Sequence, residues 1–379
     1  MRLNWSAYYA VLFLYRCVFS VLGQTVVMRL TSIPDTEGYQ SHGLGYVAYA
    51  TSQMSFDPAL TMQGQATLIT AIVGAFFSFL GGGNPILINI GFQTIAFIGI
   101  WRMLDALDPE IRKYCAVLVM LPSFSVWSSI ASKEAIVVFL VGMLGRYIIQ
   151  IYQGRGRLRI RHVLWFFLLY VFKPHFAPAI LFLIGVPLVA RWSRQPAAIA
   201  VGAGFVSLIP LYLLRDSVDA YVLRVVRSVY AEPGASTRDE RIISQAYDFF
   251  AHAPQGMFRA FMGPTLSEAT SGILHLMSFA ESILIVVLIL LYVVPRLPRL
   301  PAYLAIVSFF TVFWVLLANY PLGIANPGTA VRYRTDWLLL IFLGTIFLCS
   351  RAVYMGWRAP RARLVRIEEA QPAAVPQPG

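Results

Sequence analysis

Two carboxylates follow the first apolar segment of the chain, Asp35 and Glu37, with Tyr39 and His42 within the next five residues. A carboxylate held at a membrane surface can act as a general base toward a sugar hydroxyl, or it can bind a divalent ion. The Pro-Asp and Glu-Gly pairs here also suit a solvated turn, which is the structural alternative. We take Asp35 and Glu37 as candidate catalytic residues, and Tyr39 and His42 as candidate substrate contacts.

Lys133 and Glu134 are adjacent between two apolar segments, where lipid-facing surface does not easily explain either of them. Glu134 can stabilise the start of the following helix, with Ser132 as its N-cap, and that structural role could suffice. The functional alternative is a polar wall of an outward cavity. Both residues are candidate substrate contacts.

Lys173 and His175 flank Pro174 inside an otherwise apolar stretch. Ionisable residues within membrane segments point to function, because burying them unpaired is costly. A lysine at an irregular turn can bind a phosphate as a point charge, whereas the structural alternative is a side chain that reaches the interface. We include both among the candidate substrate contacts.

Arg332, Tyr333 and Arg334 precede the last apolar segment. Arginine binds phosphate in a bidentate geometry, and phosphate or pyrophosphate is the charged end of a polyprenyl carrier. The alternative is an arginine–aspartate cluster at the membrane interface that involves Asp336. These three residues complete the candidate binding set.

Membrane helices must position these residues, because 58% of the 379 residues are hydrophobic and only 13% are charged. Backbone polar groups in lipid must be satisfied within each segment, and the long apolar runs do not alternate as barrel strands do. The sequence therefore predicts an all-α, polytopic membrane bundle of about ten spans. The clear apolar segments are 6–28, 66–81, 85–101, 114–131, 134–152, 163–172, 176–190, 196–214, 273–294, 302–319 and 336–350.

Several function classes have no support in the sequence. The net charge of +12 comes from arginines and lysines mostly in short segments between apolar runs, and no nucleic-acid-binding motif accompanies them. No Walker-type loop, HExxH or GxSxG occurs, and the three cysteines lie far apart without CxxC spacing. The sequence predicts no metal site and no certain cofactor, although a divalent cation could assist.

Three of the apolar segments are too short or too broken for ordinary spans. Segment 66–81 ends in three glycines and is predicted to be a juxtamembrane or re-entrant helix, while 163–172 and 176–190 form a broken pair. The excess of arginine in short loops then places both termini in the cytoplasm and all the candidate residues outside.

The chain is predicted to be one membrane domain over residues 1–367. Its extracytoplasmic loops cover about 29–84, 215–270 and 320–336, and residues 368–379 are predicted to be a disordered cytoplasmic tail rich in Pro, Ala and Gln.

Two charges lie within apolar segments. Arg16 in the first segment needs a charged partner or a hydrated pocket. Glu281 in segment 273–294 is one possible partner, but the sequence alone does not establish the pair.

Taken in chain order, these motifs resemble bacterial membrane glycosyltransferases of the GT-C type and the related O-antigen-like polysaccharide polymerases. The acidic first loop at Asp35 and Glu37, the stretch from Pro122 to Glu134, the Lys173-Pro174 break and the late Arg-Tyr-Arg at 332–334 carry the resemblance, together with the stretch from Pro254 to Glu281. The chain lacks the soluble C-terminal domain of larger members, which favours a lipid-linked saccharide or glycan acceptor.

The resemblance implies a GT-C-like bundle in the bacterial inner membrane, with polysaccharide-assembly proteins as partners. It would transfer a sugar from a polyprenyl-(pyro)phosphate donor to a saccharide acceptor during surface polysaccharide or exopolysaccharide synthesis. Asp35 or Glu37 would be the base, and Arg332 and Arg334 would stabilise the leaving phosphate. The alternatives are a flippase or transporter of lipid-linked saccharide, and a noncatalytic membrane subunit of an export complex.

Overall fold

The computed structural model describes residues 4–30, 34–41, 45, 51, 58–231, 236–350 and 353. These residues form helices and turns without any strand, as the composition predicts. His42 and the segment 368–379 lie outside the described residues.

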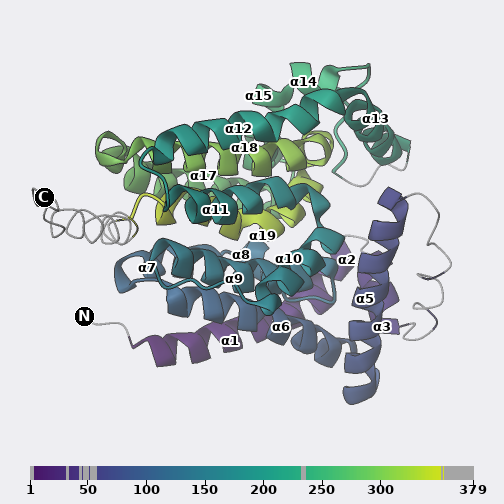
Figure 1. Cartoon of the computed structure of the whole chain (residues 1–379). Helices are drawn as coiled ribbons and strands as arrows, with labels where there is room; N and C mark the ends of the chain where they lie inside the picture. The colour runs from purple at the N-terminus through teal and green to yellow at the C-terminus, as the bar shows by residue number, and fades with distance from the viewer. Residues whose placement is uncertain are drawn as a thin grey trace, which may run out of the picture.

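The helices of the first half run as follows (Figure 1): α1 Trp5–Leu22, continued by a π-helical turn Gly23–Val27 and α2 Met28–Leu30, then α3 Pro34–Ser41, α5 Pro58–Leu80, α6 Pro85–Ala106, α7 Pro109–Val119, α8 Pro122–Trp127, α9 Lys133–Tyr152 and α10 Ile160–Phe172. The second half comprises a 3-10 turn η2 Pro174–Phe176, α11 Ala177–Ala190, α12 Pro196–Leu213, α13 Arg215–Ala231, α14 Asp248–Ala251, α15 Ala253–Met262, α16 Leu266–Ala269, α17 Ile273–Val293, η3 Val294–Arg299, α18 Ala302–Ala325, α19 Pro327–Phe342 and a π-helical turn η4 Leu343–Phe347.

Six helices in the described part of the chain are long and apolar enough to cross a membrane. They are Trp5–Leu30, Pro85–Ala106, Lys133–Tyr152, Pro196–Leu213, Ile273–Arg299 and Ala302–Ala325. The apolar helices Gly64–Leu80, Ile160–Phe172 and Pro174–Ala190 are shorter. The predicted count of about ten spans is therefore not confirmed.

The predicted span 114–131 is divided in the structure. It contains the end of α7, then α8, and then a turn that leads to Lys133. Pro122 explains the break, because a proline has no N–H to continue a helix and its ring forces the preceding residue out of the helical region. Leu121 accordingly has an extended backbone, with ψ of 132°.

Helix α5 contains all but the last residue of the predicted short segment 66–81, and it runs across the ends of α1 and α6 rather than alongside them (Figure 1). The start of α1 and the end of the helix formed by α19 and η4 lie at the same end of the bundle.

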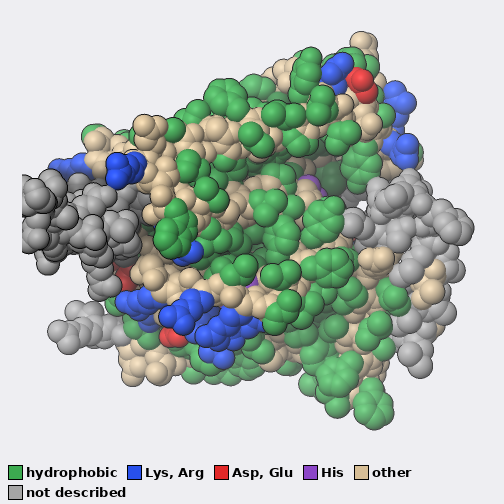
Figure 2. Space-filling view, in the orientation of Figure 1, with side chains coloured by type: hydrophobic (Ala, Val, Ile, Leu, Met, Phe, Trp, Pro, Cys, Tyr) green, Lys and Arg blue, Asp and Glu red, His purple; other side chains and the backbone are tan. Residues whose placement is uncertain are grey.

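The core of the bundle is the contact between α6 and α9. A Cβ atom on Gly99 would lie 2.5 Å from the backbone Cα of Phe139, and one on Gly142 would lie 2.4 Å from the carbonyl of Gly99. Small residues that let helix backbones approach closely are typical of packing between membrane helices. The outer helices α12 and α17 instead keep large apolar side chains such as Phe205 and Leu291 exposed, as lipid-facing helices do, and apolar side chains cover much of the face in Figure 2.

Candidate functional site

Arg332 lies at the centre of the candidate site, in the second turn of α19. Its Nε atom donates to Oε1 of Glu134 at 2.7 Å and its Nη2 atom donates to Oε2 at 3.2 Å, so the pair is bidentate. The same Nη2 atom is 3.8 Å from Oδ2 of Asp35. Three segments that are far apart in the sequence therefore meet at one guanidinium.

The two carboxylates at Arg332 have different surroundings. The side chain of Glu134 is 2% exposed, whereas that of Asp35 is 49% exposed. Glu134 is in the first turn of α9, where the Ser132 side chain accepts a hydrogen bond from the backbone N–H of Ala135 at 3.3 Å, so the predicted N-cap is present. Glu134 is thus committed to its ion pair, while Asp35 can be reached from solvent.

A second ion pair adjoins the first. Nζ of Lys173 is 2.8 Å from Oδ2 of Asp336, whose side chain is fully buried, and it lies over the ring of Tyr333 at 4.1 Å from the centroid. Pro174 ends α10 at this point, which leaves Lys173 in the irregular turn as its C-cap. His175 occupies the same turn, and its ring contacts Phe176.

The Lys133 side chain interacts electrostatically with Asp35, Glu134, Lys173 and Arg332, but it makes no hydrogen bond or ion pair in the described part of the chain. We refer to Asp35, Lys133, Glu134, Lys173, Arg332 and Asp336 as the charged cluster. It contains three cations and three carboxylates, and Lys133 is the cation whose charge is not committed to an ion pair.

Arg334, in contrast, belongs to a separate buried network. Its Nη2 atom is 3.1 Å from Oε2 of Glu281, and the side chain also bonds to Ser282 and Ser123. Only 3% of the Arg334 side chain is exposed. Arg334 therefore joins α19 to α8 and α17. Its guanidinium is not part of the charged cluster.

This network also settles the partner of Glu281, which is Arg334 and not Arg16. Arg16 donates to the carbonyl oxygen and the hydroxyl of Ser128, at 3.0 and 2.9 Å, and its guanidinium faces the ring of Phe124. Arg16 thus joins the first helix to the turn that precedes Lys133.

Helix α3 presents its candidate residues on different faces. Glu37 is exposed, and Tyr39 is 1% exposed and packs through its backbone carbonyl against Gly74 of α5. Residues two apart on a helix do not share a face, so Glu37 and Asp35 point in different directions. The structure brings Asp35, but not Tyr39, to the charged cluster.

Two amides that the sequence analysis overlooked hold α3 in place. Gln40 donates to Gln24 and to Asn89, both at 2.8 Å, and the Asn89 side chain also accepts from the backbone N–H of Ala131 at 2.8 Å. Asn89 therefore links α3 to the turn before α9. Its presence within an otherwise apolar segment was the signal that could have identified it, because a buried amide needs hydrogen-bond partners.

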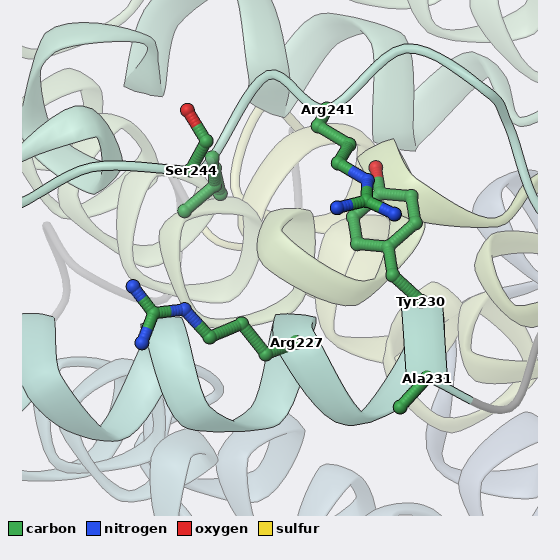
Figure 3. A pocket seen from close by; sticks show the side chains of 6 residues that line it. Arg227, Tyr230, Ala231, Arg241 and Ser244 are labelled. Atoms are coloured by element: carbon green, nitrogen blue, oxygen red, sulfur yellow. The ribbon is translucent and has the colours of Figure 1, made fainter.

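Two cavities in the second half of the chain are lined by residues other than those of the charged cluster. A crevice of about 10 Å³ beside Tyr333 has room for about one water molecule. A larger cavity of about 250 Å³ is lined by Arg227, Tyr230 and Ala231 of α13 and by Arg241, Ile243 and Ser244 (Figure 3). Arg241 lies over the ring of Tyr230, and no residue of the charged cluster lines this cavity. The described residues include no group of three His, Cys, Asp or Glu that could hold a metal ion.

Arg238 joins the segment before α14 to the end of α18. It donates to the carbonyl oxygens of Gly323 and Ile324, at 3.1 and 2.7 Å, and it pairs with Glu268 at 2.6 Å. Partial burial acts to raise the pKa of Glu268, but hydrogen bonds from Arg238 and from the backbone N–H of Thr265 outweigh it and lower the pKa to about 2.

The Glu268→Gln variant is expected to unfold at a lower temperature than the wild type at pH 7. A carboxyl whose pKa is lowered by folding stabilises above its unfolded pKa of about 4.3, and loses that contribution as the pH falls toward 2. The difference should therefore shrink in thermal unfolding measured in detergent below about pH 4. Glu240→Gln, which removes a pair between Arg259 and a 61% exposed carboxylate, should have a smaller effect. A difference in unfolding temperature between the wild type and Glu268→Gln that does not change with pH would contradict the lowered pKa of Glu268.

Comparison with known proteins adds no relative: no protein-family model, no curated protein and no solved structure matches this chain.

Proposed function

We propose that the protein is a membrane glycosyltransferase or polysaccharide polymerase that acts at the extracytoplasmic face. It would use a sugar donor linked to polyprenyl phosphate or pyrophosphate, in the synthesis of a surface polysaccharide. The observation that carries the proposal is the charged cluster, in which a half-exposed carboxylate, Asp35, lies beside Arg332 and near the uncommitted ammonium of Lys133. Sugar transfer needs a cation to stabilise the anionic leaving group and a carboxylate to accept the proton of the hydroxyl, and both must lie close together.

The reaction under this proposal is a displacement at the anomeric carbon with inversion. Asp35 takes the proton of the acceptor hydroxyl as the acceptor oxygen bonds to the anomeric carbon. The bond from that carbon to the phosphate oxygen breaks, and the phosphate leaves with the electron pair. Lys133 and Arg332 stabilise the charge that develops on the phosphate.

The catalytic and phosphate-binding roles proposed here differ at two residues from those that the sequence resemblance implies. Arg334 is paired with Glu281 in a buried network, so Lys133 replaces it as the second cation for phosphate. Glu37 faces away from Asp35 on α3, so Asp35 is the preferred base.

The direct test is sugar transfer in proteoliposomes that contain the purified full chain. Polyprenyl-phosphate-linked and polyprenyl-pyrophosphate-linked hexoses, labelled in the sugar, are supplied with a lipid-linked saccharide acceptor. We expect labelled product with a new glycosidic bond and release of the unlabelled polyprenyl carrier. Movement of intact donor between leaflets without a new bond would instead identify a flippase. Absence of both activities, with loss of assembly in cluster variants, would identify a noncatalytic subunit.

A further inference from the structure

A third cavity lies between α6, α9 and α10. It has a volume of about 190 Å³, many times the roughly 10–15 Å³ that a cavity needs to hold one water molecule. Its lining residues are Arg102, Met143, Arg146, Tyr147, Gln150, Arg161, His162 and Trp165. Three arginines from three different helices therefore face one cavity, and no carboxylate lines it.

The guanidinium groups of these arginines are not neutralised by the protein. In the described part of the chain, the side chains of Arg102, Arg146 and Arg161 make no ion pair and no hydrogen bond. Arg102 lies over the ring of Trp101 at 4.9 Å, and Arg161 over that of Trp165 at 5.8 Å. Stacking on an aromatic face leaves the N–H groups at the edge of a guanidinium available to a ligand.

His162 forms the wall of the cavity and is fixed there. Its ring stacks on Tyr147 at 3.9 Å between centroids, and its Nδ1 atom accepts a hydrogen bond from the backbone N–H of Arg159 at 3.1 Å. A neutral imidazole that accepts through Nδ1 carries its proton on Nε2. The wall can thus add a neutral donor to the three arginines.

The surroundings of the cavity are apolar. Val163, Leu164 and Phe167 of α10 are 48%, 53% and 57% exposed, and Trp101 of α6 is 36% exposed. Tryptophans beside basic residues at helix ends are typical of the membrane–water interface. Figure 2 shows Lys and Arg side chains gathered in the part of this face near α7 and α9. The cavity therefore combines cations for an anionic group with exposed apolar side chains for hydrocarbon.

We propose that this cavity binds the phosphodiester head group of an anionic phospholipid, with its acyl chains lying against α6 and α10. Basic pockets between membrane helices on the cytoplasmic side recognise such head groups. The loop from 153 to 159 beside the cavity carries Arg155, Arg157 and Arg159, which places it on the cytoplasmic side by the distribution of positive charge. This site does not depend on the transferase proposal.

The test is equilibrium binding of a fluorescent phosphatidylglycerol to the full chain in phosphatidylcholine nanodiscs. The variant Arg102→Gln/Arg146→Gln/Arg161→Gln is compared with Arg155→Gln/Arg157→Gln/Arg299→Gln, which removes the same charge from exposed positions that do not line the cavity. The three cavity arginines would hydrogen-bond the phosphate directly, whereas the exposed arginines would act on it only through screened, longer-range attraction. We therefore expect the cavity variant to lose at least about a hundredfold in affinity. The control variant should lose less than tenfold.

A single-residue variant and a competition measurement complete the test. Gln150→Glu adds a negative charge to the wall by a single change and should weaken binding even if the triple variant folds poorly. Unlabelled phosphatidylglycerol should displace the probe, whereas glycerol phosphate and inorganic phosphate should not. Equal losses in the two triple variants, unchanged binding in Gln150→Glu, or displacement by the free phosphates at similar concentrations would each overturn the proposal.

Discussion

Asp35→Asn is expected to lower sugar transfer by about 10²- to 10⁴-fold, the usual contribution of a general base. Asparagine has nearly the shape of aspartate but cannot accept the proton of the acceptor hydroxyl. The carboxylate lies 3.8 Å from Arg332 and half of its side chain is exposed, so the change leaves the buried pair of Arg332 with Glu134 in place. The loss should therefore appear in the turnover rate, with little change in thermal stability.

The matched control is Asp239→Asn, because Asp239 is an exposed carboxylate between α13 and α14 that lies outside the charged cluster. Both variants are assayed in proteoliposomes with labelled polyprenyl-linked donor, and each is checked by thermal unfolding in detergent. Wild-type turnover in Asp35→Asn would remove the assignment. A large loss in Glu37→Gln together with normal turnover in Asp35→Asn would transfer the role of base to Glu37.

The sequence was sufficient to predict the helical class and much of the cluster. Lys133, Lys173 and Arg332 stood out because charges in apolar surroundings are costly and must have partners or a function. The partners themselves were not predictable, because Arg332 and Glu134 are 198 residues apart in the chain and only the packing of α19 on α9 brings them together.

The errors of the sequence analysis have physical causes. Arg332 and Arg334 were treated as one motif, but residues two apart on a helix face different ways. One guanidinium therefore reaches Glu134, and the other reaches Glu281. The count of about ten spans is not confirmed, because six helices in the described part of the chain are long and apolar enough to cross a membrane. Pro122 also divides the segment 114–131, which the sequence analysis took as one continuous helix.

Lys173→Met is expected to cause a large loss of stability, about 3–5 kcal/mol, because it leaves a buried carboxylate without its cation. The Asp336 side chain is fully buried, and its Oδ1 atom has no hydrogen-bond partner among the described residues. Removing the charge of the other partner, by Asp336→Asn, should lower the free energy of unfolding by less. Lys173 is 11% exposed and keeps the ring of Tyr333 as a partner, so its charge is less isolated.

The double variant Lys173→Met/Asp336→Leu separates two contributions to stability. One is the net contribution of the ion pair, and the other is the destabilisation caused by a buried charge without its partner. Replacing a buried ion pair by apolar side chains of similar volume is often neutral, whereas removing one partner is not. We therefore expect the double variant to be more stable than Lys173→Met alone, in a double-mutant cycle of unfolding free energies measured in detergent. A double variant less stable than Lys173→Met would contradict this. It would mean that the two side chains stabilise the helices through independent contacts, and that Asp336 does not depend on Lys173.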